Sequence, residues 1–250
     1  MSERKNYKKP PAVEALFETY FSETQSNLTL FGDFYQRIKN DYPTQKELKN
    51  VGFEMNFTHE IVQTKQLNQG AMMRFSREDD SELVQITQNL LTVNKLKPYS
   101  GYDVFKNSIQ KALEHYLILS KPKYVERIGL RYINRISIPE KNFILEDYFN
   151  FSINFSKENE GFSSISGILF KVQLTPKNES HKLFITLSSI PSADEGKSEF
   201  ILDIYDIFIL QKEVSRDFIL SVLDEAHRNV EYIFEGVITD STRNIFEETK

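Results

Sequence analysis

Residues 124–138 read YVERIGLRYINRISI, a run in which apolar and polar side chains alternate. Successive side chains of a β-strand point to opposite faces of its sheet. One face of this stretch is therefore apolar, with Ile128, Leu130, Tyr132, Ile136 and Ile138. The other face carries Arg127, Arg131 and Arg135, spaced about 13 Å apart at about 3.3 Å per residue. We expect a long strand with one face buried against a core.

Two roles fit the three arginines. A row of guanidinium groups suits a series of phosphates or an acidic protein surface. In that role the arginines should be exposed and incompletely paired. In the other role each arginine pairs with a carboxylate of the same sheet, and the row is structural. The carboxylates on predicted strands are Glu14, Glu18, Asp203 and Asp206.

The residues before this strand predict a mixture of strands and amphipathic helices. In chain order they predict a strand at 13–21, a helix at 30–42, strands at 51–57, 71–76 and 83–96, and a helix at 102–116. Pro43 and Pro122 end the two helices, because proline removes a backbone donor and clashes with the preceding turn.

The stretch 83–96 is interpreted as one long strand. Gln85, Thr87 and Asn89 then fall on one face, and Val84, Ile86 and Leu90 on the other. If the polar face is the one that carries the arginines, Gln85 and Asn89 are candidate ligand-binding residues beside them. Alternatively, these residues form the solvent face of a half-buried strand.

The residues after the arginine strand repeat a similar order. They predict a short helix at 143–149, strands at 151–155, 167–175, 182–190 and 199–210, and a final helix whose apolar stripe spans 219–233. Ser215 is the expected N-cap of that helix, with Asp217 in its first turn. The tail 240–250 is either a last helical turn or frayed.

Each half of the chain thus reads roughly as β-α-β-β-β-α, with the division at 1–121 and 122–250. The fold class is α+β, with a mostly antiparallel sheet and amphipathic helices on one face. A duplication would give two halves related by a pseudo-twofold axis, and the order is similar to the tandem repeats of saddles like that of the TATA-binding protein. The alternative is one continuous domain whose halves are alike only in order. Fold analogy alone carries no function.

Composition excludes several functional classes. The 250 residues include no cysteine, which excludes disulfide scaffolds, thiolate zinc sites and thiol nucleophiles. No run of about 18 apolar residues is present, so no membrane-spanning helix is expected. No secretory signal is visible, and we expect a cytoplasmic protein. The net charge of −5 argues against a non-specific nucleic-acid binder.

Sequence motifs for catalysis or cofactor binding are incomplete. Gly196-Lys197-Ser198 lacks the first glycine of a phosphate-binding loop, and no dinucleotide-binding or nucleophile-elbow pattern occurs. The four histidines show no metal-binding spacing. We therefore expect no cofactor, no metal and no catalytic residue.

These observations favour a non-enzymatic binding protein with Arg127, Arg131 and Arg135 at its site. The partner would be an acidic protein surface, a nucleotide or a nucleic acid. The alternative is an enzyme that clamps a phosphorylated substrate with these arginines. That enzyme would need Glu14, Asp203 or His181 to converge with the arginines in one pocket.

Three segments carry a resemblance to a known family. Residues 10–15 (PPAVEA), 90–99 (LLTVNKLKPY) and 126–136 (ERIGLRYINRI) resemble a sporadically distributed family of bacterial proteins of about this length. The resemblance brings no activity with it, so no residue inherits a catalytic role. The patchy distribution implies accessory genes, such as phage-defence or toxin–antitoxin cargo, and a partner protein from a neighbouring gene.

Overall fold

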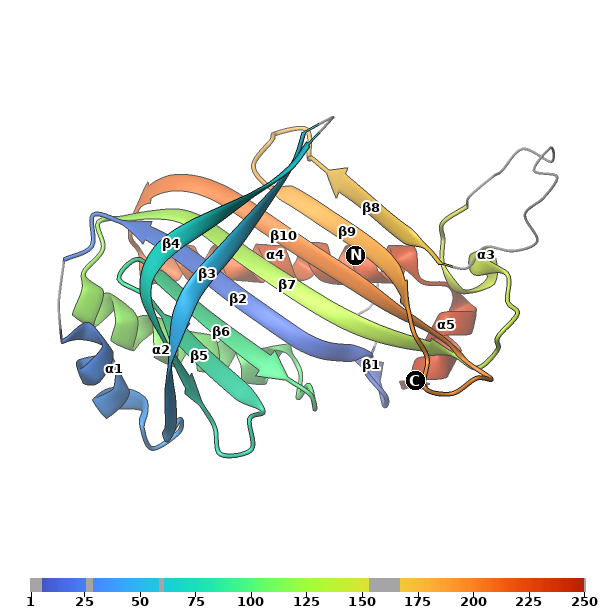
Figure 1. Ribbon diagram of the computed structural model, residues 1–250, viewed down its shortest axis with the longest axis horizontal. Helices are drawn as coiled ribbons and strands as arrows, with labels where there is room; N and C mark the ends of the chain where they lie inside the picture. The colour runs from blue at the N-terminus through green and yellow to red at the C-terminus, as the bar shows by residue number, and fades with distance from the viewer. Residues whose placement is uncertain (1–5, 26–28, 59–60, 153–166, 250) are drawn as a thin grey trace. The chain divides into compact units, whose positions relative to one another are not determined.

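The structure is a computed structural model, and it describes residues 6–25, 29–58, 61–152 and 167–249 (Figure 1). The helices are α1 (Leu30–Ile38), α2 (Tyr102–Ser120), α3 (Leu145–Tyr148), α4 (Arg216–Val237) and α5 (Asp240–Phe246). The strands are β1 (Asn6–Tyr7), β2 (Ala12–Ser22), β3 (Thr44–Thr58), β4 (Ile61–Ser76), β5 (Glu82–Ile86), β6 (Leu90–Leu96), β7 (Tyr124–Ile138), β8 (Leu169–Leu174), β9 (Lys182–Ile190), β10 (Ser198–Glu213) and β11 (Glu248–Thr249).

Nine of these strands form a sheet in the order β3-β4-β5-β6-β2-β7-β10-β9-β8. The neighbouring pairs whose register is defined, such as β9 with β10 and β5 with β6, are antiparallel. The α+β class with an antiparallel sheet is therefore confirmed. β1 and β11 form a separate antiparallel pair near the two ends of the chain.

The chain divides into two compact units. Unit 1 comprises Met1–Ala15, Gly129–Ile209 and Ser221–Lys250, and unit 2 comprises Leu16–Ile128 and Leu210–Leu220. The unit boundaries fall inside β2, β7, β10 and α4. The proposed division at 121 and 122, and the duplication it implies, stay predictions.

In unit 2, α2 packs on β6 and α1 packs on α2 (Figure 1). α2 forms because its apolar residues recur three and four positions apart and can share one buried face. Its fully buried side chains include Phe105, Ile109, Leu113 and Tyr116. Tyr116 stacks on Phe21 of β2, with ring centroids 5.4 Å apart. This contact ties the helix to the centre of the unit's strands.

In unit 1, the core lies between β10 and α4. Along β10 the buried residues are Phe200, Leu202, Ile204, Asp206 and Phe208, so the even positions from 200 to 208 face the core. The buried stripe of α4 includes Leu223, Ala226 and Val230. The start of α4 belongs to unit 2, and there Ser215 accepts a hydrogen bond from the Phe218 N–H at 3.3 Å, which confirms the predicted N-cap.

Four predicted elements before β7 are wrong in extent. The strands predicted at 51–57 and 71–76 are the much longer β3 and β4. The stretch 83–96 is two strands, β5 and β6, joined by a tight turn in which the Thr87 N–H donates to the Leu90 carbonyl. The helix predicted over 30–42 ends at Ile38, and Tyr42 is buried beyond it. The first half therefore has four strands between its two long helices, where the sequence predicted three.

The remaining predicted elements, apart from those at 51–57 and 71–76, match more closely. β7 and β9 have the predicted bounds, and the tail forms α5 and the short β11. Most of the strand predicted at 151–155 lies outside the described residues. In the part of the chain that the structure describes, no helix has the length and apolar character needed to cross a membrane.

Candidate functional site

Arg131, in unit 1, lies on the face of β7 opposite the core. Its guanidinium donates two hydrogen bonds to the Asp203 carboxylate on β10, at 2.8 and 2.6 Å. The guanidinium also lies 5.8 Å from the centre of the Tyr205 ring. The hydrogen bond to Asp203 raises the pKa of Arg131 above its ordinary value. This bidentate geometry holds the side chain in one orientation.

Arg135, also in unit 1, pairs with the next carboxylate along the same face of β10. Its Nε lies 2.9 Å from an oxygen of Glu199. Burial acts to raise the pKa of Glu199, but hydrogen bonds from Arg135 and Ser137 lower it below its ordinary value. Glu199 is therefore an ionised partner under ordinary conditions.

Arg127, in unit 2, pairs with Glu18 of β2 at 2.5 Å. Its guanidinium lies 4.2 Å from the centre of the Tyr20 ring, within the range of a cation–π contact. Burial, together with the charge of Glu18, raises the pKa of Tyr20. This arginine is held from two sides, by a carboxylate and by a ring.

All three arginines are thus ion-paired within the chain, as the structural interpretation predicted. The expectation of incompletely paired arginines does not describe them. In each pair, however, the arginine is the more exposed member. The exposed fractions of the side chains are 37% and 11% for Arg127 and Glu18, 38% and 17% for Arg131 and Asp203, and 49% and 10% for Arg135 and Glu199.

A third cation, Lys171, lies on the face of unit 1 that carries Arg131 and Arg135. Asp203 is the register partner of Thr186 on β9, which is in turn the partner of Lys171 on β8. The Lys171 ammonium lies 5.6 Å from the centre of the Phe184 ring. Register partners of antiparallel strands share a face. Arg131, Asp203, Thr186 and Lys171 therefore form one row across four strands of unit 1.

The structure does not bring Gln85 and Asn89 together as a ligand site. Gln85 donates to Thr92 and Asn94, both at 3.2 Å, and accepts a bond from Arg74 at 3.3 Å. Asn89 lies in the turn between β5 and β6, where its carboxamide oxygen accepts a bond from the Thr87 hydroxyl. Gln85 belongs to a cross-strand polar network, and Asn89 to a turn.

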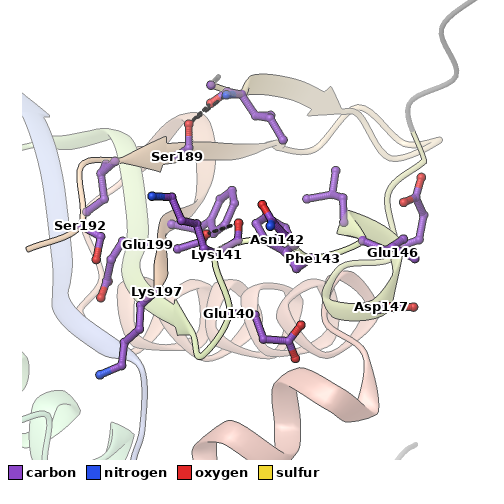
Figure 2. Close-up of a pocket in the computed structure, with 17 residues that line it drawn as sticks. Glu140, Lys141, Asn142, Phe143, Glu146, Asp147, Ser189, Ser192, Lys197 and Glu199 are labelled. Carbon is purple, nitrogen blue, oxygen red and sulfur yellow. Dashed lines mark hydrogen bonds between the residues drawn. The ribbon is translucent and has the colours of Figure 1, made fainter. Parts of the chain in front are cut away.

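A pocket of about 1020 Å³ lies in unit 1. It is lined by residues 140–147, 167–168, 189–190, 192 and 197–200. Figure 2 shows Ser192, Lys197 and Glu199 toward one side of it, and Glu146 and Asp147 toward the other. Phe143 and Phe200 meet edge to face in its wall, with ring centroids 5.5 Å apart.

The enzyme hypothesis required three named groups to converge in one pocket with the arginines. Glu14, Asp203 and His181 are not among the residues that line this pocket, and neither are Arg131 and Arg135. Within the described residues, no group of three His, Asp or Glu side chains is placed to hold a metal ion.

Sequence reasoning missed Glu199, although the signal was present. In β10, Glu199 and Asp203 are four residues apart, so they share a face, and the arginines of β7 have the same spacing. Asp206 is at an even position and faces the core, so it was wrong to name it as a partner of these arginines. It contacts Asn229 and lies near His181 instead.

Comparison of the sequence with models of known protein families found no match, and comparison with curated proteins found none. The resemblance to a bacterial family therefore stays a prediction. The functional argument rests on the geometry of the described residues.

Proposed function

We propose that the protein is a non-enzymatic binding protein that engages an acidic or phosphate-bearing partner through the arginine-bearing sheet face. The observation that carries the proposal is the orientation of the ion pairs. The carboxylates are largely covered, and the guanidinium groups reach outward from them. A partner that approaches this face of unit 1 meets Arg131, Arg135 and Lys171 first.

Internal pairing is compatible with this role. An arginine side chain loses rotamer freedom when it binds a ligand, and a carboxylate that already fixes its orientation reduces that loss. Arg135 donates to Glu199 through Nε, and the guanidinium has five N–H donors in all. The ion pairs therefore preorganise donors for a second acceptor, at the cost of part of the positive charge.

The enzyme alternative has weaker support. Asp203 lies on the arginine-bearing face of β10, whereas His181 lies near Asp206, on the core-facing side of the same strand. A clamp with a nearby acid or base requires these groups on one side of the sheet.

The wider setting is also part of the proposal. We infer a cytoplasmic protein that acts as an accessory component of a bacterial defence or toxin–antitoxin locus, with a partner encoded nearby. The order β2-α1-β3-β4-β5-β6-α2 followed by β7-α3-β8-β9-β10-α4 supports a duplication of a strand–helix–strands–helix unit. Both inferences can be tested separately from the binding face.

Replacing Arg131 and Arg135 together with glutamine is expected to weaken binding of an anionic probe roughly tenfold or more. A hydrogen bond to a charged group contributes about 1.5–3 kcal/mol, and about 1.4 kcal/mol is a factor of ten. Fluorescence anisotropy would measure binding of a labelled oligo-glutamate peptide and, separately, a labelled single-stranded oligonucleotide.

The two probes distinguish an acidic-protein partner from a nucleic-acid partner. Arg216→Gln is the matched control, because Arg216 is an exposed arginine at the start of α4. It should leave the affinity unchanged. Equal affinities for the wild type, the double variant and the control would contradict the proposal.

A further inference from the structure

Asp206 is a fully buried carboxylate on the core-facing side of β10 in unit 1. Its Oδ2 accepts a hydrogen bond from the Asn229 side chain of α4 at 2.8 Å. Its other oxygen, Oδ1, accepts none in the structure as described. A buried polar atom without a partner carries a desolvation cost that a proton or a cation relieves.

His181, which directly precedes β9, is an ionisable neighbour of this oxygen. Its Nε2 lies 3.8 Å from Asp206 Oδ1 and 3.4 Å from the Asn229 amide nitrogen. Its Nδ1 lies 3.0 Å from the Ser180 hydroxyl. The ring stacks on Phe208, with centroids 4.7 Å apart, and its side chain is largely covered. The imidazole is therefore fixed beside the carboxylate.

The charged groups that act on Asp206 come from two directions. His181 favours the ionised carboxylate, and Glu225 of α4 disfavours it. The hydrogen bonds from Asn229 and from the Ile207 backbone also favour ionisation. Burial is nevertheless the largest influence, and it raises the pKa of Asp206 to about 6. Asp206 in the folded protein therefore binds a proton more tightly than an exposed aspartate does.

We propose that Asp206 and His181 form a buried proton-binding site that makes the packing of α4 and of the segment before β9 against β10 depend on pH. In the protonated state the site holds a neutral carboxyl. In the deprotonated state it holds a buried carboxylate that His181, Asn229 and the Ile207 backbone offset in part. The proposal is independent of the binding face, which lies on the other side of β10.

The direction of the pH dependence follows from the raised pKa. An exposed aspartate has a pKa of about 4, so between about pH 4 and about pH 6 the folded state binds more protons than the unfolded state. The stability that Asp206 contributes is complete below about pH 4. This contribution is lost as the pH rises through about 6, and above that pH the site no longer changes the stability of the protein with pH.

Asp206→Asn tests the site by thermal unfolding at about pH 5 and about pH 7.5. An asparagine keeps an oxygen for Asn229 and removes the titratable charge from the buried position beside His181. We expect a higher Tm than the wild type at the upper pH, and a smaller difference between the two pH values. Asp194→Asn is the matched control. A backbone hydrogen bond from Gly196 and the Lys197 side chain lower the pKa of Asp194, so it stays ionised at both pH values.

A second variant keeps the proposal testable if Asp206→Asn does not fold. His181→Gln removes the neighbour that favours the ionised carboxylate, so the pH at which stability is lost should move upward. Relative to wild type, an unchanged pH dependence in Asp206→Asn, or an unchanged midpoint in His181→Gln, would overturn the proposal.

Discussion

Glu82→Gln is expected to destabilise the protein by about 3 kcal/mol, because it removes a buried carboxylate charge from a cluster of polar groups. Removing one partner of a buried ion pair costs about 3–5 kcal/mol. Glu82, in unit 2, is almost fully buried, and Lys95 and Arg77 lie 3.6 and 3.4 Å from its oxygens. The Tyr42 hydroxyl donates to the same carboxylate. Burial, followed by the charge of Glu82, raises the pKa of Tyr42.

The loss of stability should appear as a lower urea concentration at the unfolding midpoint. The slope of the free energy of unfolding against urea concentration should not change. Glu23→Gln is the matched control, since Glu23 and its partner Lys123 are both exposed. Surface ion pairs contribute about 0–1 kcal/mol. If the two variants proved equally stable, the buried ammonium of Lys95 would not depend on Glu82, and the description of this cluster would be wrong.

Phe149→Ala is expected to cost about 3–5 kcal/mol, the range for removing a buried phenyl ring. Phe149, in unit 1, is fully buried, and its ring meets that of Phe200 edge to face with centroids 5.4 Å apart. Its backbone pairs with Ile238, after the end of α4. The ring thus connects the end of α3 to β10.

Differential scanning calorimetry would measure this loss. Ile144→Ala serves as the control, because Ile144 is a large apolar residue in the same segment but is exposed. It should change stability by less than about 0.5 kcal/mol, as surface substitutions usually do. If Phe149→Ala lowered the stability as little as Ile144→Ala, the segment at 145–149 would not be packed against β10.

The long elements were predictable because their patterns are strong over many residues. β7 alternates over most of its length, and the stripe of α2 recurs over five turns, so periodicity alone sets their faces. Such patterns also fixed which face of β7 carries Arg131. Local chemistry was enough for Ser215, whose side chain caps the helix that follows.

The tight turn between β5 and β6 was missed for a physical reason. A two-residue turn at Gln88 and Asn89 does not interrupt the alternation, since Ile86 and Leu90 are both at even positions. The only signal was the unbroken polar run from Thr87 to Asn89, which favours a turn over a strand. Neither residue is the glycine that marks the commonest tight hairpins.

The candidate site was only partly predictable. Alternation placed the arginines on one face and suggested Glu18 and Asp203 as partners. It could not give the register between β7 and β10, which depends on tertiary pairing and decides that Glu199 meets Arg135. The proximity of His181 to Asp206 depends on the same kind of long-range pairing, between the start of β9 and β10.

The most direct test of the binding face compares two variants that differ at Arg131 alone. Asp203→Asn removes the carboxylate and leaves the guanidinium, whereas the double variant Arg131→Gln with Asp203→Asn removes both charges and keeps the net charge of the wild type. Affinity for the oligo-glutamate and oligonucleotide probes would be measured for both by anisotropy, at low and at physiological salt. We predict that at least one probe binds more tightly to Asp203→Asn than to wild type, and roughly tenfold or more weakly to the double variant than to Asp203→Asn. Equal affinities of the two folded variants for both probes would contradict the claim that Arg131 presents its charge to a partner.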